Sequence, residues 1–433
     1  MALTTRIPVV LREEPQFRLF FAGQALSMLG DRITFIAIPF AVLSIGGSAT
    51  QVGLVAGAQT VPFALLSLAA GVWADRVDRR AIMIASDVVR LLCQLIAGTL
   101  LVTGQAEIWH LAAIGAVFGA ADAFFSPSMV GLLPQVVSMG HLQQANALRG
   151  LTMSSGLVVG PAVGGVLIAV LGVGSALLVD AATFAISIAC LLRVRPRVAE
   201  RLTEPEPNFL SGLRNGWHEV RARSWVMAFL ASMIVYHLVV LPSVFVLGPV
   251  ISDRDLGGPS AWALIVAAFG VGAVIGDLIL LRWRPSRPLR VSSMLLIVAS
   301  CQAAIIGSGM PLAAIAGLEL LTGIAVTGYF TLWETSLQEH IPEHAISRVS
   351  SYDFTLSVGL MPIGFALVGP VADSLGLQTT VIMMSATGIC AALACLCVPS
   401  VRGLSRPPSM PRPSARPAPA PAAPPRRRGR SDP

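Results

Sequence analysis

Long apolar runs separated by short polar connections are the main pattern along this chain. Each run holds roughly 20 or more mostly apolar residues, which is the length that a helix needs to cross a bilayer. The runs are continuous rather than alternating, and transmembrane strands are only about 9–11 residues long. The pattern therefore predicts an all-α membrane protein with twelve spanning helices, at 17–45, 50–73, 81–102, 108–133, 147–171, 174–193, 225–249, 260–281, 289–308, 311–334, 350–371 and 377–398.

The spacing of these runs predicts two six-helix halves related by pseudo-symmetry. The longest internal polar stretch, 196–224, indicates a cytoplasmic linker between an N-terminal half at 15–195 and a C-terminal half at 225–398. Short motifs recur in the two halves at similar spacing, as in secondary transporters that are built from internal repeats. Residues 1–14 are then a cytoplasmic N-terminus, and the Pro/Arg-rich residues 399–433 predict a disordered cytoplasmic tail.

Composition supports this class, and the charge distribution predicts the orientation. Of the 433 residues, 55% are hydrophobic and only 12% are charged, against about 45–50% and 25% in soluble domains. The chain has no lysine. Its internal arginines gather in the connections after spans two, six and eight, whereas the connections on the other side hold only Arg254. The positive-inside bias places both termini in the cytoplasm. The net charge of +7 follows from this topology and does not indicate a nucleic-acid partner.

The sequence shows no pattern that indicates a cofactor, a metal or an enzyme. The six cysteines fall inside apolar segments, where a thiol behaves as a small hydrophobic group. His340 and His344 are four residues apart, but Pro342 separates them in a loop, so no metal site is predicted. The chain has neither a phosphate-binding glycine loop nor a nucleophile elbow, which argues against ATP-driven transport and catalysis by this chain alone.

The connection between spans two and three, residues 71–80, reads Gly-x-x-x-Asp-Arg-x-x-Arg-Arg. It resembles the signature loop of the major facilitator superfamily, and the resemblance covers residues 15–400 and implies that family's two-half fold. Shorter stretches are similar to its bacterial macrolide-efflux and enterobactin-export branch of drug:proton antiporters. These are Leu29-Gly30-Asp31, Asp87-x-x-Arg90, Ala123-Phe124-Phe125-x-Pro127, Ala145-Asn146-Ala147-Leu148 and Asp180-Ala181.

The resemblance implies that this loop is a conformational latch between the two halves. Asp75 can accept hydrogen bonds from the free N–H groups at a helix N-terminus, where a carboxylate is favoured. In the family the partner is the start of span eleven. We therefore expect the latch to comprise Gly71, Asp75, Arg76, Arg79, Arg80, Asp87, Arg90 and Asp353. The alternative is that the arginines merely follow the topology.

Span five carries a run of small residues, Gly156, Gly160, Pro161, Gly164 and Gly165. Small residues four apart allow helices to cross closely, and the proline removes a backbone hydrogen bond and kinks the helix. The run resembles the motif associated with drug antiporters in the family, which favours export. Tight packing with no directional consequence is the alternative.

Carboxylates inside the spans are the sharpest functional signal. A charge at the bilayer centre costs roughly 2.5–3.5 kcal/mol on insertion scales, so such residues face a cavity or a partner. The resemblance implies that spans one, four, seven and ten line the cavity. Because burial favours the neutral carboxylic acid, these groups could exchange protons. We therefore expect the proton and substrate site to draw on Asp31, Asp122, Glu334, Gln24, Ser126, Tyr236, His237 and Phe330. Asp180 and Asp373 lie near segment ends and are expected to cap helices.

Together these features predict a monomeric secondary transporter in the inner, or cytoplasmic, membrane of a bacterium. Its predicted partners are the lipid bilayer, protons as the coupling ion and an amphipathic small-molecule substrate, such as a drug, an antibiotic or a siderophore, which it exports by proton antiport. Two alternatives remain open, a proton-coupled importer of a small nutrient and a transporter-shaped receptor or scaffold that moves no substrate.

Overall fold

The computed structural model describes residues 8–74, 77–197, 217–342, 346, 349, 352–353, 355–357 and 359–406. Within those ranges every regular element is helical, and twelve helical stretches are long and apolar enough to cross a membrane. The predicted all-α class and the twelve spans are therefore confirmed. The loop residues Asp75 and Arg76, most of the linker and the tail beyond Arg406 lie outside the described residues.

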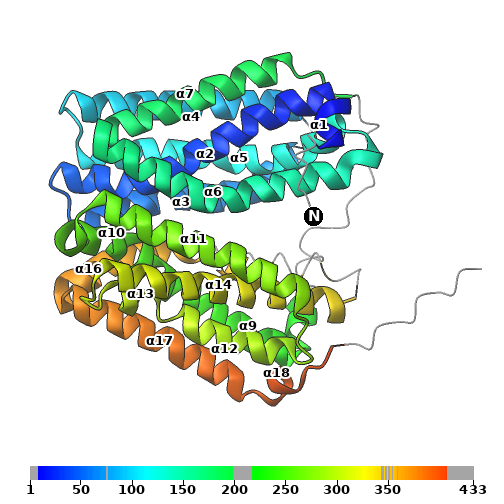
Figure 1. The fold of residues 1–433 in the computed structure, drawn as a ribbon, viewed down its shortest axis with the longest axis vertical. Helices are drawn as coiled ribbons and strands as arrows, with labels where there is room; N and C mark the ends of the chain where they lie inside the picture. The colour runs from blue at the N-terminus through cyan, green and yellow to red at the C-terminus, as the bar shows by residue number, and fades with distance from the viewer. Residues whose placement is uncertain are drawn as a thin grey trace, which may run out of the picture.

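The N-terminal half forms one bundle, the blue to green part in Figure 1. Its spans are 21–30 residues long, enough to cross the hydrocarbon core with some tilt. The elements are α1 (Val9–Glu13), α2 (Pro15–Ser44), α3 (Ala49–Ala74), α4 (Arg79–Val102), α5 (Ile108–Val136), η1 (Met139–His141), α6 (Leu142–Leu171) and α7 (Val173–Arg193).

The C-terminal half forms a second bundle, green to orange in Figure 1. Its first span is one long stretch, Ser224–Leu256, interrupted by three π-helical turns around Pro242 and Pro249. A proline has no N–H to donate along the helix, and π-turns are frequent at functional sites. The elements are α9 (Ser224–Val235), η2 (Tyr236–Val240), η3 (Ser243–Leu247), α10 (Gly248–Ile251), η4 (Ser252–Leu256), α11 (Pro259–Arg282), α12 (Pro288–Ala299), α13 (Gln302–Ile306), α14 (Leu312–His340), α16 (Met361–Leu375), α17 (Leu377–Cys397) and α18 (Pro399–Gly403).

The expected boundary of the tail differs from the structure. Residues 399–403, which we assigned to the disordered tail, form α18 instead. Val401 of this short helix is fully buried in the apolar core of the C-terminal half. Burial of that side chain holds the segment against the bundle.

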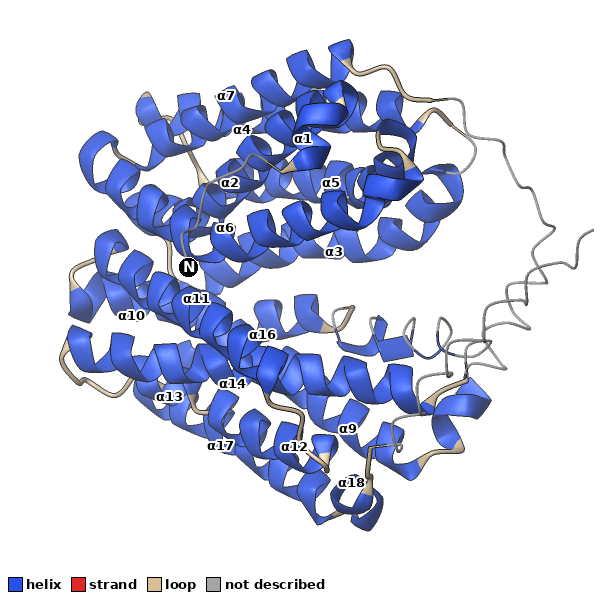
Figure 2. Cartoon of the chain, turned by 45° about the vertical axis from the view of Figure 1, so that its right-hand side comes forward, coloured by secondary structure: helices blue, strands red, loops and turns tan. Residues whose placement is uncertain are grey.

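The two halves touch where α6 meets α11 and where α3 meets α16. A Cβ atom on Gly165 would lie 2.3 Å from Ala263 Cβ, and one on Gly369 would lie 2.3 Å from Thr50 Cα, so glycine permits both approaches. These contacts lie at the end of the bundles opposite to α1, near the start of α3 and the end of α6. Figure 2 shows the two bundles close together near α10 and α11 and diverging toward the end where α18 lies.

Among the described residues, a hydrogen bond joins the halves at this contact. Thr50 Oγ1 donates to Asp373 Oδ2 at 2.5 Å, from the start of α3 to the last turns of α16. Asp373 therefore does not cap a helix N-terminus, and that expectation was wrong. Its carboxylate instead fastens the two halves together at the surface.

At the opposite end, Glu14 ties three segments of the N-terminal half together. Its carboxylate accepts hydrogen bonds from the Ser138 N–H at 2.9 Å and from Arg197 Nη2 at 3.0 Å, and His141 Nδ1 lies 3.4 Å away. The hydrogen bonds from Ser138 lower the pKa of Glu14 from its ordinary value near 4.5 to about 2, with His141 and Arg197 acting in the same direction. The start of α2, the α5–α6 connection and the entry to the linker are thereby held together.

Glu14→Gln should lower the melting temperature of the purified protein at pH 7, because the charged acceptor is lost. A depressed folded-state pKa stabilises above the unfolded pKa, and that stability disappears as the pH falls from about 4.5 towards 2. The difference between variant and wild type should shrink over that window. The matched control is Glu13→Gln, which removes a more exposed carboxylate 3.5 Å from His141 Nε2 and should have a smaller effect. An equal loss at pH 7 and pH 3 would contradict the assignment.

Candidate functional site

Arg90 of α4 is the centre of the polar cluster in the N-terminal half. Its side chain is 1% exposed, and its Cζ lies 5.1, 4.7 and 4.3 Å from the ring centroids of Phe118, Phe125 and Phe184. Aromatic faces attract a cation, but they do not replace the lost hydration of a guanidinium inside a membrane. Arg90 therefore requires carboxylate partners.

Three aspartates from three helices supply those partners. Asp31 Oδ1 of α2 lies 2.5 Å from Arg90 Nη2, Asp87 Oδ1 lies 3.3 Å from Nη1, and Asp122 Oδ1 of α5 lies 3.9 Å from Nη2. Asp87 is fully buried, whereas the side chains of Asp31 and Asp122 are 35% and 37% exposed. The two aspartates predicted for the proton site thus share one guanidinium and are the two that are partly exposed.

Asp180 of α7 is a fourth carboxylate, and sequence reasoning missed it. It is fully buried and accepts hydrogen bonds at Oδ2 from Thr34 Oγ1 at 2.6 Å and from Gln94 Nε2 at 2.7 Å. The cap of α7 is Gly172, so the expectation that Asp180 caps a helix was wrong. The available signal was Gly30, one residue before Asp31. A Cβ there would lie 2.1 Å from Asp180 Oδ1, so only glycine lets α2 approach this carboxylate.

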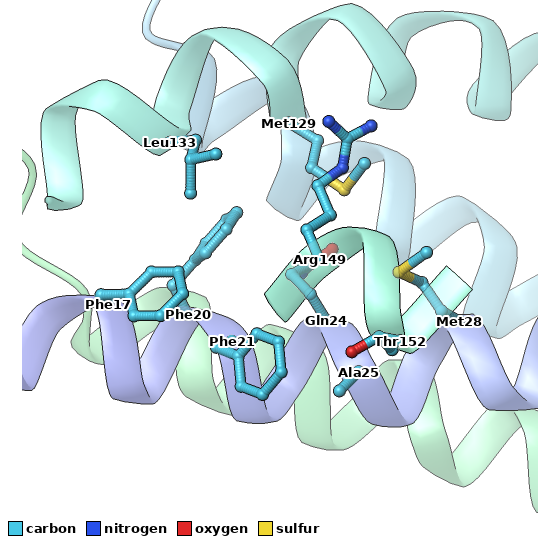
Figure 3. Close-up of a pocket in the computed structure, with 10 residues that line it drawn as sticks. All are labelled: Phe17, Phe20, Phe21, Gln24, Ala25, Met28, Met129, Leu133, Arg149 and Thr152. Atoms are coloured by element: carbon cyan, nitrogen blue, oxygen red, sulfur yellow. The ribbon is translucent and has the colours of Figure 1, made fainter. Parts of the chain in front are cut away.

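Neutral donors connect Asp87 to the predicted residue Gln24. Ser187 Oγ donates to Asp87 Oδ2 at 2.7 Å, and Gln24 Nε2 donates to Ser187 Oγ at 3.0 Å. Gln24 also lines a cavity of about 300 Å³ among α2, α5 and α6. Figure 3 shows Gln24 and Arg149 there, between three phenylalanine rings of α2 and two methionines.

The charges of this cluster do not balance when every group is ionised. Three carboxylates contact Arg90 and Asp180 lies beside them, whereas the nearby cations are Arg90 and Arg32, which interacts with Asp31, so negative charges would remain in excess. Each unpaired buried charge is costly, whereas a protonated carboxylic acid is neutral and still donates one hydrogen bond. Protons are thus the simplest means by which the cluster can change its charge.

The structure places the remaining predicted cavity residues apart from this cluster. Ser126 is exposed on α5, one turn beyond Asp122, and Phe330 and Glu334 are exposed on α14. Tyr236 is buried and donates to Gln302 Oε1 at 3.1 Å, while His237 Nδ1 lies 2.9 Å from the Met233 carbonyl oxygen. These residues belong to the C-terminal half, except Ser126.

Arg79, Arg80 and Asp353, three of the predicted latch residues, have polar contacts within their own halves. Arg79 Nη1 donates to the Gly131 carbonyl at 2.7 Å, and Arg80 Nε donates to the Leu191 carbonyl at 2.7 Å. These carbonyls lie near the C-terminal ends of α5 and α7, where a cation is favoured. Asp353 accepts from Trp333 Nε1 at 3.1 Å in the C-terminal half. Asp75, Arg76 and the surroundings of Gly71 lie outside the described residues, so the latch stays a prediction.

The small residues of span five, in α6, pack against two other helices. Cβ atoms on Gly156 and Gly160 would meet the Arg32 side chain at 3.7 and 2.2 Å, and one on Gly164 would meet Ile33 Cα at 3.3 Å. Gly165 faces Ala263 of α11 in the other half, and Pro161 lines a cavity between the halves. The motif thus brings α2, α6 and α11 together.

Among the described residues, no group of three or more His, Cys, Asp or Glu side chains is placed to hold a metal ion.

Comparison with known proteins agrees with this architecture. A family model described as Major Facilitator Superfamily matches residues 20–361. The multidrug efflux pump Tap of Mycolicibacterium fortuitum is 27% identical over 391 residues, covering 87% of this chain and 93% of that protein. Macrolide efflux protein A of Streptococcus pyogenes is 26% identical over 403 residues, covering 90% and 97%.

Solved structures show the same fold at low sequence identity. A bacterial homologue of the iron transporter ferroportin in an inward-facing state superposes with a TM-score of 0.70 at 17% identity, covering 88% of this chain and 98% of that chain. The nucleoside transporter NupG gives 0.71 at 11% identity, with the same coverage of 88% and 98%. At these identities the likeness concerns the fold alone.

Gly30→Ala should destabilise the protein, since the new methyl group would overlap the Asp180 carboxylate. Overpacking of this kind costs about 1–3 kcal/mol. We expect a lower melting temperature of the purified protein. Gly150→Ala in α6 is the matched control, because a Cβ there meets nothing within 4 Å and alanine favours a helix by roughly 1 kcal/mol over glycine. Equal melting temperatures for Gly30→Ala and Gly150→Ala would contradict the proposed close approach.

Proposed function

Because the chain belongs to the Major Facilitator Superfamily, we propose that this multi-pass membrane protein exports an amphipathic small molecule in exchange for protons. Efflux is supported by the two relatives described above, which are named as multidrug and macrolide efflux pumps and match over most of their length. The observation that carries proton coupling is the buried Arg90 shared by Asp31 and Asp122.

Protonation of Asp31 would change the partners of Arg90. A neutral Asp31 loses its charge attraction at 2.5 Å, so the guanidinium then favours Asp122, now 3.9 Å away, and Asp87. Since these groups come from α2, α4 and α5, a proton shifts the balance of forces among three helices. A buried ion pair that loses one partner is strongly destabilised, which supplies the energy for a change of state.

Alternating access is supported by the asymmetric contact between the halves. The contacts of α6 with α11 and of α3 with α16 close the end opposite to α1. The arginine distribution assigns the N-terminal end to the cytoplasm. This conformation is then the one that takes substrate from the cytoplasm, and rocking of the halves would open the other end.

Asp31→Asn and Asp122→Asn should each reduce proton-driven extrusion at least tenfold, because an amide cannot carry the proton. The assay follows erythromycin in vesicles with an imposed proton gradient, comparing everted with right-side-out vesicles. Asp255→Asn, which changes an exposed aspartate, is the control and should extrude as the wild type does. Normal extrusion by both cluster variants would overturn the coupling assignment. Accumulation in right-side-out vesicles would indicate an importer, and binding without movement in either orientation would indicate a receptor.

A further inference from the structure

A second and larger cavity lies between the two halves. Its empty space is about 620 Å³, part of which is open to the surroundings, and it is lined by α2 and α6 from one half and by η3, α11, α13 and α14 from the other. Its wall is mainly aromatic and aliphatic, and it contains two side chains of opposite charge, one from each half. The residues that matter here are Arg32, Phe35, Phe245, Trp262, Phe269 and Glu319.

Glu319 of α14 presents an unsatisfied carboxylate oxygen to this cavity. The residue is 1% exposed, and its Oε2 accepts from Gln302 Nε2 at 3.0 Å and from Thr322 Oγ1 at 2.7 Å. Gln302 is itself held by the Tyr236 hydroxyl at 3.1 Å. The other oxygen, Oε1, is buried without a hydrogen-bond partner among the described residues. Buried polar atoms are rarely left unpaired, so this one indicates a missing donor.

Arg32 of α2, from the N-terminal half, is the oppositely charged residue of the lining. Its Cγ lies 3.7 Å from where a Cβ of Gly156 would be, and its Cβ fills the space that a side chain at Gly160 would need. These contacts fix the stem of the arginine against α6, and the residue lines the cavity. A guanidinium offers five N–H donors, so it suits an oxygen acceptor on a ligand.

Aromatic rings complete the surface between the two charges. Phe35 and Phe245 meet edge to face across the two halves, with centroids 5.1 Å apart. Rings of this kind bind apolar groups and also favour a cation over their faces.

We propose that this cavity binds an amphipathic amine, with the protonated nitrogen on Glu319 Oε1 and an oxygen acceptor of the same molecule on Arg32. The proposal rests on the transport function proposed above and names its substrate class. A neutral ligand would leave the Glu319 oxygen unpaired, and a simple organic cation would give Arg32 no acceptor. A lactone or amide that also carries a basic amine satisfies both.

The position of Arg32 connects this cavity to the Arg90 cluster. Asp31 and Arg32 are neighbours on α2, about 100° apart around the helix, and Asp31 contacts Arg90 while Arg32 lines the cavity. A rotation or shift of α2 therefore moves both groups at once. Binding of the substrate at Arg32 and binding of a proton at Asp31 would thus both change the forces on α2.

The test measures binding to the purified full-length protein in lipid nanodiscs at pH 7.5. The probes are erythromycin, which carries a basic amine and carbonyl oxygens, and tetraphenylphosphonium, a cation without an acceptor. We expect Glu319→Gln to weaken erythromycin binding at least tenfold, which corresponds to about 1.4 kcal/mol. Glutamine keeps the acceptor for Gln302 and Thr322, and the melting temperature of each variant checks that it is folded.

Arg32→Gln should also weaken erythromycin binding but leave tetraphenylphosphonium binding unchanged or stronger, since a positive charge is removed. Asp255→Asn is the control and should bind both probes as the wild type does. Unchanged erythromycin affinity in folded Glu319→Gln overturns the proposal, as does failure of the wild type to bind erythromycin. The vesicle assay tests efflux separately. If the wild type extrudes erythromycin but Glu319→Gln binds it with unchanged affinity, the binding site proposed here is wrong and the proposed transport function is not affected.

Discussion

The buried guanidinium of Arg90 is the constraint on which the N-terminal half depends. A cation at that depth must find carboxylates, and it finds them on α2, α4 and α5, while Ser187 extends the network to α7. Four of the six spans of this half are thus tied to one charge. The cluster contains more carboxylates than guanidinium groups. The same side chains that hold the helices together can therefore change their net charge by binding a proton.

The two halves distribute their polar groups differently, although their helices correspond. The N-terminal half holds an arginine with several acids, whereas the C-terminal half holds Glu319 with the neutral donors Gln302 and Thr322. An ion pair can exchange partners, but a single carboxylate held by neutral donors keeps its position and remains able to bind a cation. This difference fits a proton site in one half and a substrate contact in the other, joined by α2.

Glycine determines how closely these groups approach. Gly30 admits the Asp180 carboxylate next to α2, Gly160 admits the stem of Arg32, and Gly165 admits α11 from the opposite half. In a bilayer, where lipid tails are as apolar as leucine, such close contacts supply much of the association between helices. The small residues of α6 therefore position the arginine of the cavity as well as the interface between the halves.

Properties that depend on local sequence were predictable: the twelve spans, the family and the presence of acids within spans one and four. Whether a segment enters the bilayer depends on the hydropathy and charge of its own residues, so these properties can be read from a single sequence. The partners were decided only by the tertiary structure. Arg90 meets Asp31 across 59 residues, and Thr34 meets Asp180 across 146. Such pairs, and the cavity lined by both Arg32 and Glu319, depend on how each helix is rotated and tilted against its neighbours. A membrane helix that is apolar on all sides has no hydrophobic periodicity from which that rotation could be predicted.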